Sequence, residues 1–216
     1  MTDRSQRTLV RVLLERHGQT FADELGIRLE RGTPSALFRL LVASILFSTR
    51  IRHGLAVEAA RALFRQGWTT PQKLGAARWS QRVRVLNRAG YARYDESSSR
   101  MLGDTCDVLL ERYRGDLRRL RAEAEQEPRR ERMLLKEFKG IGDVGVDIFF
   151  REAQLAWEEL YPFADRRTRQ AAARLGLPTE PEALARLVPR REFPRLLAAL
   201  VRTSLERDFA AVREVA

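Results

Sequence analysis

The sequence predicts an all-α fold, and three observations support this prediction. Apolar residues recur at spacings of three and four along almost the whole chain, which is the period of helices that bury one face. No segment alternates polar and apolar residues over the length of a strand. Glycine and proline stand between the apolar blocks, where they end one helix and precede the next. We therefore expect about eight to eleven short helices joined by short loops.

The apolar blocks give the expected helices in chain order. They lie at 9–14, 37–45, 56–64, 83–86, 101–113, 134–138, 146–153 and 197–205. The glycine and proline punctuation falls at 32–34, 67–71, Gly90, Gly115, 140–142 and 176–178. The stretch 118–132 is highly charged and contains Pro128, so we interpret it as a solvated helix and loop.

The composition is that of a globular protein with a hydrophobic core. The chain has 216 residues, of which 44% are hydrophobic and 32% charged, and this fits one domain or two small ones. No apolar run approaches the ~18 residues of a membrane span, and the charged first residues do not resemble a signal peptide. The single cysteine, Cys106, excludes a disulfide framework, a cysteine-ligated iron–sulfur cluster and a cysteine-rich zinc site. We expect a reducing, cytoplasmic setting and no membrane partner.

The charge balance favours an anionic partner. There are 40 Lys and Arg residues against 29 Asp and Glu, a formal net charge of +11, and nucleic acid is the first candidate. Only Lys73, Lys136 and Lys139 are lysines, so part of the arginine excess can reflect the codon composition of the source. A soluble basic surface without such a partner is therefore the alternative explanation.

The segment 134–150, which reads LLKEFKGIGDVGVDIFF, carries the most information. Gly140 and Gly142 flank one apolar residue, and a second helix is expected to begin just after them. In such a tight turn the backbone N–H groups point outward, and with the positive end of the following helix they form a site for a backbone phosphate. We expect Ile141 to tuck into the helix pair, and Lys139 adds a positive charge. The alternative is a helix corner whose glycines only permit close packing.

Three segments resemble motifs of one enzyme family. Residues 135–142 resemble the helix–hairpin–helix motif of the endonuclease III superfamily of DNA glycosylases. Residues 165–178, DRRTRQAAARLGLP, are similar to the family's D-T-H-x-x-R-x-x-x-R-L-G-L segment, and Asp165 falls on its essential aspartate. Residues 38–46 resemble the family's F-x-L-L-x-x-x-L-L helix. Together the resemblance spans about residues 35–178.

The resemblance implies two α-helical domains that flank a cleft. Residues 30–158 would form a helical barrel that ends in the hairpin, and residues 1–29 would join residues 159–216 in the second domain. It also implies a base-excision repair enzyme that hydrolyses the N-glycosidic bond of a damaged or mispaired base flipped out of duplex DNA. Such an enzyme would be a monomer and would be associated with the nucleoid in the cytoplasm.

The resemblance also assigns roles to individual residues. Asp165 would be the catalytic carboxylate; the alternative is that it only caps a helix, for which Asp is well suited. The hairpin residues implied to bind the DNA backbone are Lys139, Gly140, Ile141, Gly142, Val144 and Gly145. Those implied to fill the gap left by the base, or to contact the opposing strand, are Thr49, Arg50, Tyr91 and Arg93. For Tyr91 the alternative is a core position with its hydroxyl at the rim.

Two departures from the family pattern narrow the expected activity. Val144 stands where the bifunctional members carry the lysine that attacks the sugar, so we expect base excision without strand cleavage. The iron–sulfur cysteines found near the C-terminus of many members are absent. We therefore expect no iron–sulfur cluster, no other metal and no cofactor, apart from a monovalent cation that the resemblance places at 138–142.

Two other functions remain open on the sequence alone. The first is a helix–hairpin–helix DNA-binding protein without catalysis, in which Asp165 is only a cap. The second is a lyase that acts on abasic sites through a different amine, for which Lys139 is the nearby candidate. The residues also leave open which base would be removed.

Overall fold

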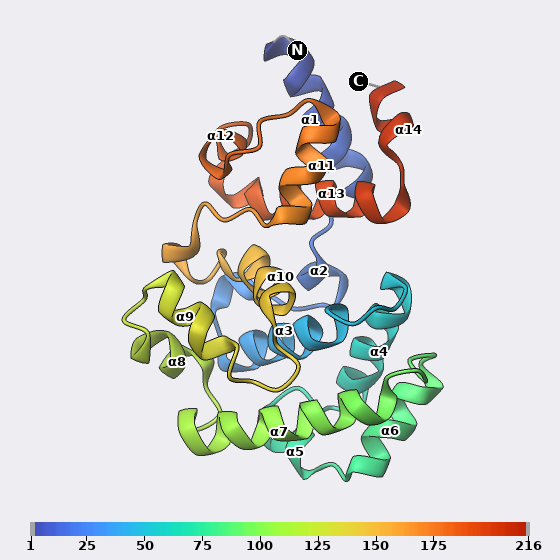
Figure 1. The fold of residues 1–216 in the computed structure, drawn as a ribbon, viewed down its shortest axis with the longest axis vertical. Helices are drawn as coiled ribbons and strands as arrows, with labels where there is room; N and C mark the ends of the chain where they lie inside the picture. The colour runs from blue at the N-terminus through green and yellow to red at the C-terminus, as the bar shows by residue number, and fades with distance from the viewer. Residues whose placement is uncertain (1–2, 215–216) are drawn as a thin grey trace. The chain divides into compact units, whose positions relative to one another are not determined.

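The computed structural model describes residues 3–214, and every regular element within them is a helix (Figure 1). The chain divides into two compact units. Met1–Gly26 and Leu160–Ala216 form one, which we call the terminal unit, and Ile27–Glu159 forms the other, which we call the inserted unit. Among the described residues, no helix is both long and apolar enough to cross a membrane.

The inserted unit is built from one continuous stretch of chain. Its elements are η1 (Leu29–Arg31), α3 (Pro34–Phe47), α4 (His53–Arg65), α5 (Pro71–Ala76), α6 (Trp79–Arg88), α7 (Asp95–Tyr113), α8 (Leu117–Glu123), α9 (Pro128–Leu135) and α10 (Asp143–Ala153). The short turn η2 (Glu158–Leu160) lies at the boundary with the terminal unit.

Helix α3 is the centre of the inserted unit. It starts because the Thr33 hydroxyl accepts the Ala36 N–H at 3.3 Å and because Pro34 fills the first helical position, where no N–H partner is needed. Every residue from Leu40 to Leu46 is buried. The helix packs against α4 and α10 and also touches α7 and α8. Its apolar surface therefore holds the other helices of the unit in place.

A buried arginine joins α5, α6 and α7. Arg82 donates from Nε to the Ser99 carbonyl oxygen at 3.2 Å and from a terminal nitrogen to the carbonyl oxygens of Ala77 (2.5 Å) and Leu74 (3.2 Å). Burial lowers the pKa of Arg82. Gly103 on α7 makes room for this side chain, since a Cβ there would lie 2.7 Å from the guanidinium.

The terminal unit combines both ends of the chain. Its helices are α1 (Asp3–His17), α2 (Phe21–Glu24), α11 (Arg166–Leu175), α12 (Pro181–Ala185), α13 (Phe193–Glu206) and α14 (Phe209–Glu214), with the 3-10 turn η3 (Arg190–Glu192). Helix α13 packs against both α1 and α11, and its apolar face forms one core with Leu9, Leu13, Ala172 and Leu175. The unit exists only because segments from opposite ends of the sequence meet on α13.

Arginines on α13 fasten the chain as it leaves α1. Arg195 donates from Nε to the Gly18 carbonyl oxygen at 3.0 Å, and Arg202 donates from Nε to the Gln19 carbonyl oxygen at 2.9 Å. A terminal nitrogen of Arg202 also contacts Glu24 at 2.5 Å. These contacts fix residues 18–24 to the core of the terminal unit.

A pair of carboxyl groups lies where the chain leaves the inserted unit. Glu131 on α9 is fully buried, and neither of its oxygens receives an N–H or O–H donor. Burial, and to a lesser extent the neighbouring carboxylate of Glu159, raises the pKa of Glu131 to about 9. Burial alone would also raise the pKa of Glu159, but hydrogen bonds from Arg121, at 2.6 Å to each oxygen, and from Glu131 lower it. Burial therefore favours the protonated form of Glu131 at neutral pH, beside an ionised Glu159.

Two expectations about the helices are wrong in detail. The described residues contain fourteen α-helices rather than eight to eleven, because α2, α5, α12 and α14 have only 4, 6, 5 and 6 residues, too few for an apolar period to show. The stretch 118–132 is not simply solvated, since Leu120 and Glu131 are buried within it. Neighbouring helices, not local composition, decide that burial.

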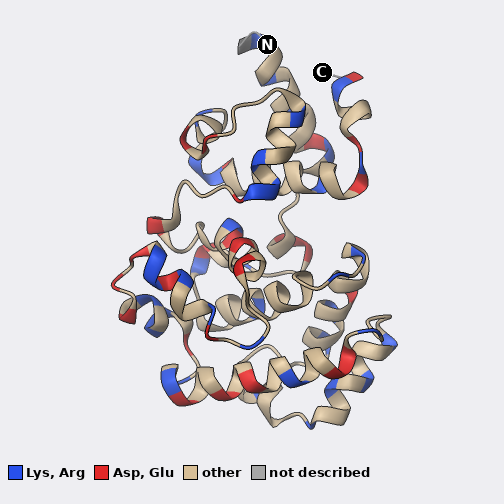
Figure 2. Cartoon of the chain, in the orientation of Figure 1, with Lys and Arg blue, Asp and Glu red and all other residues tan. Residues whose placement is uncertain are grey.

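Charged residues of both signs are distributed over the helices of both units (Figure 2). Many of the arginines form ion pairs, such as Arg132 with Asp147 at 2.7 Å and Arg169 with Glu180 at 3.0 Å. The excess of positive charge therefore does not by itself mark one binding surface. A binding surface has to be identified from the local geometry of particular residues.

Candidate functional site

Helices α9 and α10 and the turn between them form a helix–hairpin–helix. Helix α10 begins after Gly142, which has no side chain to cap the helix and leaves the N–H groups of its first turn without a side-chain acceptor. Lys139, Gly140, Gly142 and Val144 are all exposed. The N-terminus of α10 is thus exposed at the position where the glycine spacing predicts an anion site.

Two of the hairpin residues have packing roles. Ile141 is 5% exposed, as its apolar side chain predicts, and its N–H donates to the Phe138 carbonyl oxygen at 3.0 Å within the turn. That N–H is therefore used within the turn, and the expected contact of Ile141 with the DNA backbone stays a prediction. Gly145 is buried too, and a Cβ there would lie 3.1 Å from Ile141 Cδ1. These two residues hold the turn against α10.

The turn rests on α3 and α7 through Gly140. Its φ is +86°, in the left-handed region that favours glycine. A Cβ at this position would lie 2.7 Å from Met101 Sδ and 3.3 Å from Ile45 Cγ2. The Gly140 carbonyl oxygen accepts a long hydrogen bond of 3.5 Å from the Ser48 hydroxyl, which follows α3. The loop after α3 is thereby placed beside the hairpin.

Alanine is expected to destabilise the protein more at Gly140 than at Gly142. Gly140→Ala should lower the free energy of unfolding by about 1–3 kcal/mol, because the backbone conformation is strained for alanine and the contact with Ile45 is tight. Gly142→Ala should lower it by no more than about 1 kcal/mol, the difference between glycine and alanine at an N-cap, because the φ is −100° and a Cβ meets nothing within 4 Å. Urea unfolding of both variants measures the difference. Equal losses would contradict the seating of the turn described above.

The residues expected to enter the DNA differ in exposure. Tyr91 is fully buried, and its hydroxyl lies 2.7 Å from the Thr49 hydroxyl and donates to the Leu46 carbonyl oxygen at 3.0 Å. Burial raises the pKa of Tyr91. Tyr91 therefore belongs to the core, and the expectation that it reaches into DNA is corrected. Of the four, only Arg50 and Arg93 are exposed, and the Arg93 guanidinium lies 5.3 Å from the Tyr94 ring centroid.

Asp165 belongs to the terminal unit, at the start of α11. Its side chain is 4% exposed and caps the helix: Oδ1 accepts the Thr168 N–H at 2.9 Å. Oδ2 accepts a second bond, from the Thr168 hydroxyl, at 3.1 Å. The helix is held by its buried face, which includes Ala172 and Leu175, against α13. The predicted cap is present. Its partner Thr168 was not expected, although a threonine three residues after a capping Asp is a recognisable pattern.

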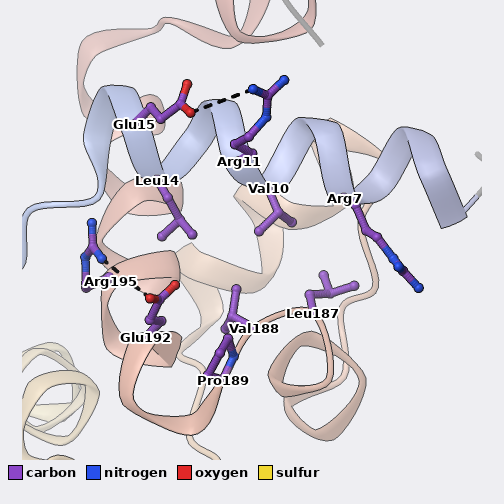
Figure 3. A pocket seen from close by; sticks show the side chains of 10 residues that line it. All are labelled: Arg7, Val10, Arg11, Leu14, Glu15, Leu187, Val188, Pro189, Glu192 and Arg195. Atoms are coloured by element: carbon purple, nitrogen blue, oxygen red, sulfur yellow. Dashed lines mark ion pairs between the residues drawn. The ribbon is translucent and has the colours of Figure 1, made fainter.

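A hollow of about 320 Å³ lies elsewhere in the terminal unit, between α1 and residues 187–195 (Figure 3). Its apolar lining is Val10, Leu14, Leu187, Val188 and Pro189, and its charged rim is Arg7, Arg11, Glu15, Glu192 and Arg195. Ion pairs join Arg11 to Glu15 at 4.0 Å and Arg195 to Glu192 at 3.9 Å. None of the site residues expected from the sequence lines this hollow.

Comparison with known proteins identifies the fold. The sequence matches no protein-family model and no curated protein. A structure of a trapped endonuclease III–DNA covalent intermediate (an estranged-adenine complex) is similar with a TM-score of 0.56 and 18% identity, covering 94% of this chain and 86% of that one. A non-covalent endonuclease III–DNA complex gives a TM-score of 0.57 and 17% identity with the same coverage. The chain therefore has the all-α fold of endonuclease III, as the sequence predicts.

Proposed function

We propose that the protein is a monofunctional DNA glycosylase, which removes a damaged or mispaired base from duplex DNA by hydrolysis. The observation that carries the proposal is the exposed, uncapped N-terminus of α10 in a helix–hairpin–helix within an endonuclease III fold. An exposed helix N-terminus binds a phosphate through its free N–H groups and its positive dipole, without regard to base sequence. Such a site suits an enzyme that must examine many sequences for one lesion.

The charges around the turn support phosphate binding. The Lys139 side chain is exposed at the turn. Asp143, the first residue of α10, would repel a phosphate, but Lys136 contacts it at 2.9 Å and Arg132 lies 3.8 Å away. The hydrogen bond from Lys136 lowers the pKa of Asp143. Its negative charge is thus balanced inside the hairpin, and the N–H groups of α10 remain available to the DNA backbone.

Gly142→Ala tests this contact without unfolding the protein. The added methyl group stands in the open space beside the turn, where a phosphate must approach the backbone closely. In the proposed complex it weakens binding to undamaged and damaged duplexes alike, because phosphate contacts carry no sequence information.

In the proposed reaction Asp165 assists the attack of water on the deoxyribose. The bond from C1′ to the base nitrogen breaks, positive charge develops on the sugar, and an ionised carboxylate stabilises that charge. The water oxygen then bonds to C1′ and gives a proton to Asp165. The departing base takes up a proton from solvent, and Asp165 returns its own proton to solvent before the next turnover. The products are the free base and an abasic site with an intact DNA strand.

Val144 is the basis for proposing hydrolysis without strand cleavage. It is the second residue of α10 and is 60% exposed, with no amine to attack C1′. Val144→Lys is expected to create a product that borohydride traps as a covalent protein–DNA adduct, because the positive helix end favours the neutral amine that attacks. Wild type and Val144→Gln should give none. Trapping of wild type, lost in Lys139→Ala, would instead support the lyase that uses Lys139.

The proposal is tested with end-labelled duplexes that each carry one alkylated purine, uracil, oxidised pyrimidine or mispaired adenine. We expect one of them to be cut only after hot alkali, which reveals an abasic site and identifies the base. Binding should also weaken steeply with salt, with a slope of about −0.9 for each phosphate contact in a plot of log affinity against log salt concentration.

The second candidate is a DNA-binding protein without catalysis. It is favoured by one observation, that both carboxylate oxygens of Asp165 accept bonds from Thr168 as they would in a purely structural cap. Salt-sensitive binding with no abasic product on any duplex would establish this candidate and would rule out the glycosylase.

A further inference from the structure

The contact between Thr168 and Asp165 exceeds what a helix cap requires. A cap needs one side-chain oxygen that accepts an N–H of the first turn, and Oδ1 of Asp165 meets that need at 2.9 Å. The Thr168 hydroxyl donates separately to Oδ2 at 3.1 Å. One residue thus contacts both oxygens of the carboxylate, and two bonds on two oxygens fix the plane of the group as well as its position.

The surroundings of Thr168 make this second bond a firm one. The residue is fully buried, so water does not compete for its hydroxyl. A threonine side chain in a helix is stiff at its first torsion, and its hydroxyl commonly donates to a carbonyl of the preceding turn. Here the hydroxyl donates to a carboxylate instead. The bond therefore stabilises negative charge on Asp165 in one orientation.

The two bonds from Thr168 do not by themselves saturate the Asp165 carboxylate, because each carboxylate oxygen has about two lone-pair positions and Thr168 uses one on each. A carboxylate held in one plane presents its oxygens in a constant direction, which removes the cost of orienting the group at each turnover.

We propose that Thr168 is a positioning residue for the reaction, which holds the Asp165 carboxylate in the plane from which it activates water. This inference rests on the proposed glycosylase function. Thr168 does not touch the substrate in this role and acts only through Asp165.

The test removes the hydroxyl and keeps the shape. Thr168→Val should lower the single-turnover rate of base excision by about 10- to 100-fold, since small misplacements of a reacting group cost rates of this order. The dissociation constant for the same duplex should stay within about twofold. Thr168→Ser restores the hydroxyl and should recover most of the rate.

Thr203 provides a matched control in the same unit. It is also fully buried in a helix, and its hydroxyl donates to the Ala199 carbonyl oxygen at 2.8 Å. Thr203→Val should lower the melting temperature about as much as Thr168→Val and leave the excision rate unchanged. Three results would each overturn the inference about Thr168 without affecting the proposed function. The first is an unchanged excision rate in Thr168→Val, and the second is no recovery of the rate in Thr168→Ser. The third is a loss of rate in Thr203→Val equal to that in Thr168→Val. A wild type that excises no base would overturn the proposed function together with it.

Discussion

Asp165→Asn is expected to stop base excision while DNA binding and stability remain close to those of wild type. Asparagine caps a helix as well as aspartate, so the bond from the Thr168 N–H is kept. It carries no negative charge for the developing sugar cation and does not take a proton from water. Loss of both effects should lower the single-turnover rate by at least about 100-fold and by as much as about 10⁴-fold.

The measurement is the rate of abasic-site formation on the duplex that wild type cuts, with the melting temperature and the DNA dissociation constant measured in parallel. Glu180→Gln is the control, because it removes the same charge from the same unit and Glu180 pairs only at the surface, with Arg169 at 3.0 Å. Its rate should equal that of wild type. An active Asp165→Asn variant would show that Asp165 is only a cap.

Glu131→Gln is expected to stabilise the protein at neutral pH. With its pKa raised to about 9 by burial, Glu131 must bind a proton on folding that it has already lost in the unfolded chain. Its contribution to stability is complete below about pH 4.5 and is lost as the pH rises toward 9. At pH 7 that loss is on the order of 3 kcal/mol, at 1.36 kcal/mol per pH unit. Glutamine keeps a donor toward Glu159 and needs no proton.

Urea unfolding of wild type and Glu131→Gln between pH 5 and 9 checks this prediction. The difference in unfolding free energy should grow with pH in favour of the variant and level off above about pH 9. Glu158→Gln is the control, since Glu158 is exposed in the turn that also contains Glu159, and it too interacts with Arg121. Its stability should follow that of wild type. A constant difference between wild type and Glu131→Gln over this range would contradict the buried, protonated state.

The features that could be predicted from the sequence are local ones. The spacing of Gly140 and Gly142 predicts the turn because few other sequences adopt it, and Thr33–Pro34 and Thr70–Pro71 mark helix starts by capping and by the fixed φ of proline. The resemblance carried by residues 135–142 and 165–178 leads to the correct fold. In each case a few neighbouring residues determine the conformation.

The features that escaped prediction depend on distant parts of the chain. Tyr91 can be buried because Leu46 and Thr49, which lie 45 and 42 residues earlier in the chain, supply hydrogen-bond partners for its hydroxyl. Glu131 stands in a charged stretch that was expected to be solvated, but it is buried and interacts with Glu159, which follows α10 in the chain. Neither neighbourhood has a sequence period. The monovalent cation at 138–142, the cytoplasmic location and the monomeric state stay predictions.

The division of the terminal unit between the two ends of the chain has a consequence during synthesis. Helix α1 leaves the ribosome before the inserted unit, but α11 and α13, its partners in the core, are made only after residue 159. The inserted unit is continuous, so it can fold as it emerges, while the apolar face of α1 around Leu9 and Leu13 waits without its partners. We therefore expect assembly to run from the middle of the chain outward, and the segment that carries Asp165 to be positioned only once α13 has been made.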